Sequence, residues 1–182
     1  MKQESTVKYI LRLALTLFAI TSIVAACLAA VNGVTAPRIA AAKAAKVQQA
    51  VEAVLPGGGE EMKEFPETQY VHKVYSSDAG YAVEVGPSGF NGEITMMVGV
   101  SKDGRVLGIS IVTQTETAGL GAVSAAKTAA GEAFRGQYAG KSGTLAVTKD
   151  GGEIDAITGA TITSRAVTAG VNAALSCVAA MG

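Results

Sequence analysis

Residues 155–164 read Asp-Ala-Ile-Thr-Gly-Ala-Thr-Ile-Thr-Ser and gather four hydroxyl side chains around a Gly-Ala pair. The hydroxyls belong to Thr158, Thr161, Thr163 and Ser164, and an apolar segment with helical spacing follows at once. A turn of small residues that opens a helix presents unpaired backbone N–H groups and the positive end of the helix dipole. This arrangement suits a phosphate, and a threonine hydroxyl beside a bound phosphate can become the atom that carries it.

The same residues also allow a purely structural interpretation. In a helix cap, Thr163 or Ser164 accepts a backbone N–H at the start of the last helix. A cap uses one or two hydroxyls, whereas this segment has four. The pattern alone therefore leaves both an anion site and a helix cap open.

Other kinds of chemistry find little support in the chain. It has two cysteines, Cys27 and Cys177, no Cys-x-x-Cys pair, and a single histidine, His72. We expect no zinc or iron–sulfur site from this chain alone, so a redox role needs an organic cofactor. Fifteen basic residues balance fifteen acidic ones without a basic run, which does not support nucleic-acid binding. No Gly-x-Gly-x-x-Gly motif follows a predicted strand, so we do not expect NADH to bind here.

An apolar segment near the N-terminus determines whether the chain is attached to a membrane. Residues 13–31 contain no charged side chain, and at a rise of 1.5 Å per residue they span about 28 Å, roughly the hydrocarbon core of a bilayer. We predict a transmembrane helix. A signal peptide is the first alternative, although its apolar region is usually about 7–15 residues long. Lipidation at Cys27 is the second, because Val24-Ala25-Ala26-Cys27 resembles a lipoprotein processing box.

The flanking charges predict the orientation of this helix. Lys2, Lys8 and Arg12 lie in a short tail of residues 1–12, which the positive-inside rule places in the cytoplasm. The rest of the chain then lies outside the cytoplasm as part of a single-pass protein of the cell (inner) membrane. Residues 32–59 are expected to form a short break, a connecting helix as far as Leu55, and a glycine-rich linker.

The remaining residues, 60–182, predict one α+β domain with an antiparallel sheet and flanking helices. Two hairpins are indicated, the second by an Asp-Gly turn, and the acidic residues 60–68 are expected to form a loop. The predicted strands are 69–76, 80–85, 93–101, 105–113 and 144–148, and the predicted helices are 122–135 and 165–181.

Residues 155–161 resemble the flavinylation motif Asp-x-x-(Ser/Thr)-Gly-Ala-Thr of the FMN-binding domain family. In that family FMN is attached through its phosphate to the threonine after Gly-Ala, which here is Thr161. Residues 115–121, Thr-Glu-Thr-Ala-Gly-Leu-Gly, resemble the Glu-Thr-Pro-Gly-Leu-Gly loop of the same domain, with Ala118 at the proline position. With one N-terminal span ahead of both motifs, the chain is similar to the G subunit of the Rnf ion-translocating electron transport complex.

The resemblance implies a role for each motif residue. Thr161 supplies the oxygen of the phosphoester, and Asp155 serves the flavin transferase during attachment. Thr163 remains the rival acceptor, Glu116 could instead be a solvated loop charge, and Leu120 could be ordinary core. The cofactor-binding residues implied are Thr158, Gly159, Ala160, Thr161, Glu116, Thr117 and Leu120.

The resemblance also implies a function. It predicts an electron-transfer subunit with covalent FMN, in a membrane complex that couples ferredoxin and NAD oxidoreduction to sodium or proton translocation. The implied partners are the other membrane subunits, a flavin transferase for maturation, and the membrane. Three alternatives stay open: a stand-alone extracytoplasmic flavoprotein, the C subunit of the sodium-pumping NADH:quinone reductase, and a non-redox anchored binding module whose hydroxyls only cap a helix.

Overall fold

The computed structural model describes residues 6–181 of the chain. They divide between Ala44 and Ala45 into two units, whose placement relative to each other is not defined. Residues 1–5, with Lys2 of the predicted cytoplasmic tail, and Gly182 lie outside the described residues.

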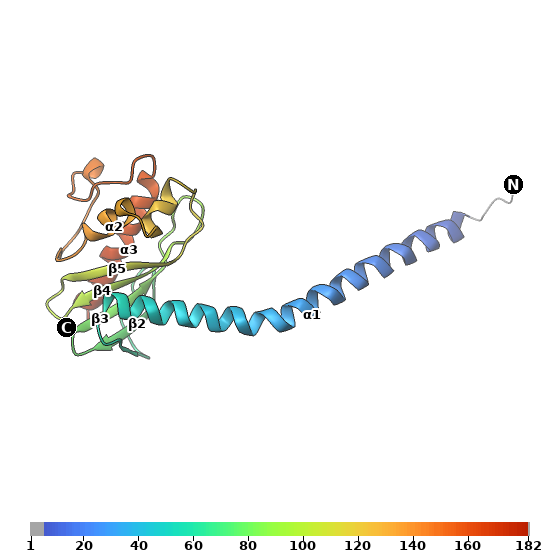
Figure 1. Cartoon of the computed structure of the whole chain (residues 1–182), viewed down its shortest axis with the longest axis horizontal. Coiled ribbons are helices and arrows are strands. Elements are labelled where there is room, and N and C mark those ends of the chain that lie inside the picture. Colours follow the sequence, from blue (N-terminus) through green and yellow to red (C-terminus); the bar gives the residue numbers. More distant parts are fainter. Residues whose placement is uncertain (1–5, 182) are drawn as a thin grey trace. The chain divides into compact units, whose positions relative to one another are not determined.

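The first unit is the greater part of helix α1, which runs over Thr6–Val54 (Figure 1). Its most apolar stretch has a mean hydropathy of 2.4 with no residue buried, so the helix is long and apolar enough to cross a membrane. The break expected at residues 32–37 is absent, because α1 continues through Pro37. Proline removes one helical hydrogen bond, to the carbonyl of Gly33, but alanine-rich sequence on both sides favours continuation of the helix.

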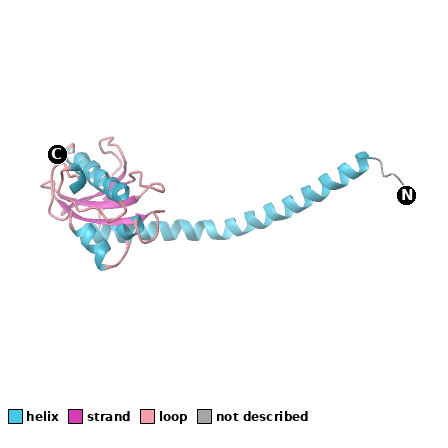
Figure 2. Ribbon diagram, turned by 90° about the horizontal axis from the view of Figure 1, so that it is seen from above, coloured by secondary structure: helices cyan, strands magenta, loops and turns pink. Residues whose placement is uncertain are grey.

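The second unit is built on a five-stranded antiparallel sheet in the order β1-β2-β3-β4-β5 (Figure 2). The predicted α+β class with an antiparallel sheet and flanking helices is thus confirmed, and both predicted hairpins are present. Two acidic residues expected in a loop form the short edge strand β1. The strands are β1 (Glu60–Glu61), β2 (Val71–Ser77), β3 (Gly80–Val85), β4 (Thr95–Ser101) and β5 (Val106–Thr113).

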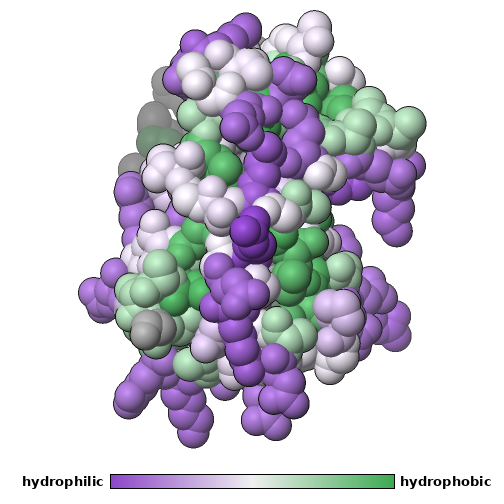
Figure 3. Space-filling view, turned by 90° about the vertical axis from the view of Figure 1, so that its left-hand side faces the viewer, coloured by the Kyte–Doolittle hydropathy of each residue, from purple (hydrophilic) through white to green (hydrophobic). Residues whose placement is uncertain are grey.

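Alternating residues of the central strands bury both faces of the sheet. In β4, Met96 and Val98 pack into the larger core with helix α3 (Thr161–Ala179), whereas Met97 between them packs into the smaller one. The smaller core also contains Val51 and Val54 of α1, so the last turns of α1 belong to this unit. This period-two pattern is the one expected of a sheet covered on both sides. At the surface drawn in Figure 3, hydrophilic side chains project from the edges with apolar patches between them.

Three predicted elements differ from the structure. The helix expected over residues 122–135 divides into a 3-10 turn, η1 (Gly121–Ala125), and helix α2 (Ala129–Gly136). The division follows from Thr128, whose hydroxyl accepts the Gly131 N–H and so starts a new helix. Helix α3 begins at Thr161, four residues earlier than expected.

The strand predicted over residues 144–148 is also absent. Only an isolated parallel bridge joins Val147 to Ile154, and the 3-10 turn η2 (Thr148–Asp150) follows. The side-chain amide of Asn172 in α3 donates to the Leu145 carbonyl at 2.8 Å and accepts the Leu145 N–H at 2.9 Å. Because a side chain satisfies the backbone groups that a neighbouring strand would otherwise pair, β-propensity does not lead to a strand here.

Candidate functional site

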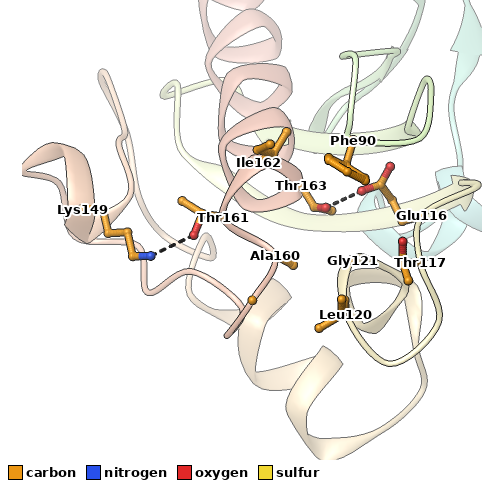
Figure 4. Close-up of a pocket in the computed structure, with 11 residues that line it drawn as sticks. Phe90, Glu116, Thr117, Leu120, Gly121, Lys149, Ala160, Thr161, Ile162 and Thr163 are labelled. Atoms are coloured by element: carbon orange, nitrogen blue, oxygen red, sulfur yellow. Dashed lines mark hydrogen bonds between the residues drawn. The ribbon is translucent and has the colours of Figure 1, made fainter.

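A cavity of about 300 Å³ lies where the loop after β5, the turn η2 and the first turn of α3 meet (Figure 4). Both sequence motifs contribute to its wall, although more than thirty residues separate them in the chain. The cavity is lined by Phe90, Glu116, Thr117, Leu120, Gly121, Lys149, Gly159, Ala160, Thr161, Ile162 and Thr163.

A tight turn leads into α3. The Ala160 N–H donates to the Ile157 carbonyl at 2.9 Å, and Gly159 has a φ of +75°, which the third position of a type II turn requires and which favours glycine. The buried Ser164 hydroxyl accepts the Ile157 N–H at 3.0 Å and donates to the Ala160 carbonyl at 3.0 Å. Ser164 therefore ties the turn to the helix and fixes where α3 begins.

The first turn of α3 is not capped by a side chain at Ala160. Thr161, Ile162 and Thr163 are the first three helical residues, and all three line the cavity. The backbone N–H groups of a first helical turn have no acceptor within the helix, and the helix dipole makes this end positive. This end of the cavity is therefore suited to an anion.

Thr161 presents its hydroxyl to this cavity. Its side chain is partly buried, and its Oγ1 accepts a hydrogen bond from Lys149 Nζ at 3.0 Å (Figure 4). The ammonium group is thus held against the threonine oxygen at the positive end of α3. An oxygen that faces the cavity beside a cation is well placed to bear a phosphoryl group, whose charge that cation would balance.

Lys149 is held by the residues that surround it. It lies in η2, and the next residue, Asp150, accepts two hydrogen bonds from Arg165 of α3, at 2.7 Å from Nε and 2.5 Å from Nη2. Hydrogen bonding to Arg165 lowers the pKa of the Asp150 carboxyl below its ordinary value. This planar two-point contact fixes η2 against α3 and places Lys149 opposite Thr161.

Thr163, two residues further along α3, faces Glu116 instead (Figure 4). Only 2% of Thr163 is exposed, and its hydroxyl donates to Oε2 of Glu116, of which 7% is exposed. The other carboxylate oxygen accepts the Asn91 N–H at 2.8 Å. Burial raises the pKa of Glu116, but hydrogen bonds from Thr163, Asn91 and Phe90 outweigh it, so the pKa lies below its ordinary value.

Comparison with known proteins identifies a family for this arrangement. The FMN-binding domain family matches residues 89–176. The chain is 36% identical over 192 residues to the G subunit of the Na(+)-translocating ferredoxin:NAD(+) oxidoreductase complex of Acetobacterium woodii, covering 91% of this chain and 89% of that protein. The chain belongs to this G-subunit family. The G subunit of the proton-translocating ferredoxin:NAD(+) oxidoreductase complex of Clostridium ljungdahlii is also 36% identical, over 81% of this chain and 80% of that protein.

Shorter matches extend the G-subunit family to other bacteria. The G subunit of the ion-translocating oxidoreductase complex of Pseudomonas aeruginosa is 37% identical over 114 residues, which are 60% of this chain and 53% of that protein. The resemblance to the Rnf G subunit inferred from the two motifs is thus confirmed, and the FMN-binding domain makes FMN the cofactor of this fold.

Six of the seven cofactor-binding residues predicted from the G-subunit resemblance line the cavity. The exception is Thr158, which is exposed on the turn and lies outside the lining. Glu116 is buried rather than a solvated loop charge, and Leu120 is 42% exposed rather than part of the core. Neither hydroxyl proposed as a cap contacts a first-turn N–H of α3, since Thr163 bonds Glu116 and Ser164 bonds Ile157. That the six residues bind FMN stays a prediction.

Four residues of the cavity lining were not predicted from the sequence: Phe90, Gly121, Lys149 and Ile162. Gly121 ends the motif at residues 115–121 and Ile162 directly follows the motif at residues 155–161, so their neighbours were a usable signal. Phe90 and Ile162 are large apolar residues that are 65% and 50% exposed, and with Leu120 they form an apolar rim around the cavity. No sequence pattern pointed to Lys149, because its position depends on the ion pair between Asp150 and Arg165.

Proposed function

We propose that this chain is the electron-transfer subunit of a membrane-bound Rnf-type complex that couples ferredoxin and NAD oxidoreduction to sodium or proton translocation. The family assignment supports this, because relatives that match most of the chain are named as the G subunit of such complexes. The subunit contributes one carrier, FMN, and passes electrons between partner subunits. FMN, when bound, supplies the redox chemistry, while the protein binds, orients and tunes it.

The FMN is attached through its phosphate to Thr161. The observation that carries this assignment is the contrast between the two candidate hydroxyls: Thr161 faces the cavity beside Lys149, whereas the Thr163 hydroxyl is buried against Glu116. Lys149 and the first-turn N–H groups of α3 hold the phosphate charge. Attachment prevents loss of a small cofactor to an extracytoplasmic medium.

The apolar rim of Phe90, Leu120 and Ile162 suits the ring system of the flavin. Aromatic and aliphatic side chains gain free energy when they cover such a ring, and all three are exposed without it. Thr117, on the same wall, is also exposed. A ring held at this open rim, rather than inside the core, remains accessible to partner subunits for electron transfer.

The proposed topology places residues 1–12 in the cytoplasm, the span at residues 13–31, and the FMN domain outside the cytoplasm. Within residues 6–181, one helix is long and apolar enough to cross a membrane, which supports one membrane crossing. Asp155, exposed on the approach to the turn, is the proposed contact for the flavin transferase that attaches FMN. It lies outside the cavity lining, which agrees with a role in attachment rather than in holding the phosphate.

Covalent attachment is tested by producing the full chain with its flavin transferase and illuminating a denaturing gel with ultraviolet light. The wild-type band should fluoresce, Thr161→Ala should be dark, and Thr163→Ala should still fluoresce where folded protein is recovered. Thr161→Ser serves as the matched control, since it retains a hydroxyl. A dark band from correctly exported wild-type protein would refute the covalent-flavin proposal. Loss of fluorescence only in Thr163→Ala would identify Thr163 as the attachment residue.

Assembly and topology are tested separately. An affinity-tagged chain should copurify with multispanning membrane subunits; isolation of the chain without them would favour a stand-alone flavoprotein. Protease added to spheroplasts should cleave the domain after the span. Cleavage in inverted vesicles with protection in spheroplasts would reverse the proposed orientation.

A further inference from the structure

Glu116 places a buried negative charge in the wall of the proposed flavin cavity. Its carboxylate oxygens are bonded within the protein, one to the Asn91 N–H and the other to the Thr163 hydroxyl. Across residues 6–181, the three ion pairs join other residues, and none involves Glu116. A buried carboxylate usually has a cationic partner, so this one stands out from the other acidic groups of the structure.

Two glycines allow the carboxylate to sit where it does. A Cβ at Gly89 would lie 2.7 Å from Oε1 of Glu116, and a Cβ at Gly121 would lie 2.7 Å from Oε2 and 2.5 Å from Thr163 Oγ1. Side chains at these positions would therefore displace the carboxylate. Glu116 thus holds together the turn at residues 89–91, the loop after β5 and the start of α3.

Neutral dipoles, not a cation, keep this group ionised. Backbone N–H and hydroxyl donors stabilise the charged form, and the pKa of Glu116 accordingly lies below its ordinary value despite burial. At neutral pH the wall therefore carries a negative charge that forms no ion pair with a described residue. The one cationic residue of the lining, Lys149, is bonded to Thr161 instead.

We propose that the fixed negative charge of Glu116 lowers the reduction potential of the flavin held in this cavity. The proposal rests on the proposed function, since it requires FMN at this site. Reduction adds negative charge to the flavin, and a carboxylate in the same cavity wall disfavours the more negative state. In this proposal the charge of Glu116 acts on the flavin through space, and the hydrogen bonds that each carboxylate oxygen accepts inside the protein hold that charge in place.

The test is a spectroelectrochemical titration of the full, flavin-loaded chain carrying Glu116→Gln, which keeps the shape and removes the charge. The midpoint potential should become more positive, with the ratio of reduced to oxidised flavin at a fixed ambient potential rising about tenfold, the effect of two unit charges about 12 Å apart at an effective dielectric constant of about 20. Glu93→Gln is the matched control, because Glu93 is an exposed carboxylate a few residues from Asn91. Its midpoint potential should equal that of the wild type.

A second pair of variants applies if Glu116→Gln is not recovered folded. Thr117 lines the same wall and is exposed, so Thr117→Lys adds a positive charge there and Thr117→Met adds similar bulk without charge. The lysine variant should have the more positive potential of the two. Equal potentials in this pair, or a wild-type potential in flavin-loaded Glu116→Gln, would overturn the proposal. A dark wild-type band on the denaturing gel would instead refute covalent FMN itself, so the two failures are distinguishable.

Discussion

Thr161 and Thr163 are the same residue type in the same turn of α3, yet their surroundings differ. Thr161 is partly exposed and its oxygen accepts from Lys149, whereas Thr163 is buried and donates to Glu116. Successive residues of an α-helix are about 100° apart, so side chains two positions apart point in nearly opposite directions. The contrast shows that the two threonines of this hydroxyl-rich segment have different roles. Thr161 is available for chemistry, and Thr163 stabilises the wall of the cavity.

The largest expected effect is on the free energy of unfolding, to which Thr163 and Thr161 should contribute differently. Thr163→Val leaves a buried carboxylate without its hydroxyl donor and should lower the free energy of unfolding by about 3 kcal/mol. Thr161→Val removes a contact with an exposed lysine and should change it by less than about 0.5 kcal/mol. Pulse proteolysis of the full chain in detergent, across a urea series, measures both. Equal losses in the two variants would contradict the division of roles.

The next effect concerns the contact between Lys149 and Thr161 at the cavity. Lys149→Met removes the ammonium beside Thr161 and should slow covalent attachment of FMN about tenfold, the cost of one charge-assisted hydrogen bond of about 1.4 kcal/mol. Lys127→Met is the matched control, because Lys127 is exposed and lies outside the lining. The measurement is the growth of gel fluorescence with time after the flavin transferase is induced. An unchanged rate in Lys149→Met would show that the ammonium does not assist the Thr161 oxygen.

The dependence of stability on pH tests the contact between Thr163 and the buried carboxylate of Glu116. The folded-state pKa of Glu116 is lowered, so its contribution to stability is fully present above the unfolded-state pKa of about 4.3 and is lost as pH falls through the folded-state value. Thr163→Val removes one cause of the lowered pKa, so stability should fall less steeply with acid below about pH 4.3 than in the wild type. Urea midpoints between about pH 3 and pH 7 test this. Parallel curves for the two proteins would exclude Glu116 as a source of the acid sensitivity.

Much of the fold could be predicted because its signals are local. Alternating apolar residues and turn residues gave the two hairpins, and the uncharged stretch indicated the apolar helix. The missing strand at residues 144–148 depends on Asn172, which is distant in sequence, and the position of Lys149 depends on Arg165. Both contacts form only after α3 has packed, so no pattern within their own segments could reveal them.

The two motifs, residues 115–121 and then 155–161, also share a tight turn, although the sequence indicated only the turn before α3. In the first, the Leu120 N–H donates to the Thr117 carbonyl at 3.1 Å and Gly119 has a φ of +76°. The turn before α3 has the same closing bond and a φ of +75° at Gly159. A Cβ at Gly159 would lie 3.0 Å from Leu120, so the two turns meet at the cavity. Similar turns thus bring distant segments together in a defined way.

The smallest expected effect follows from this turn. Ala118 occupies its second position, where proline is favoured in a type II turn, and its N–H donates no hydrogen bond to another described residue. Ala118→Pro should therefore raise the free energy of unfolding by about 0.4–1 kcal/mol, because proline restricts the unfolded chain.

The same urea series, with Ala139→Pro as a matched control, measures the gain. Ala139 donates its N–H to the Gly136 carbonyl at 3.2 Å, so proline there removes a bond and should destabilise the domain. Flavin fluorescence of Ala118→Pro should equal that of the wild type, since the turn already has the required backbone path. A loss of stability in Ala118→Pro would mean that the loop beside Glu116 departs from the type II geometry on which the wall of the cavity depends.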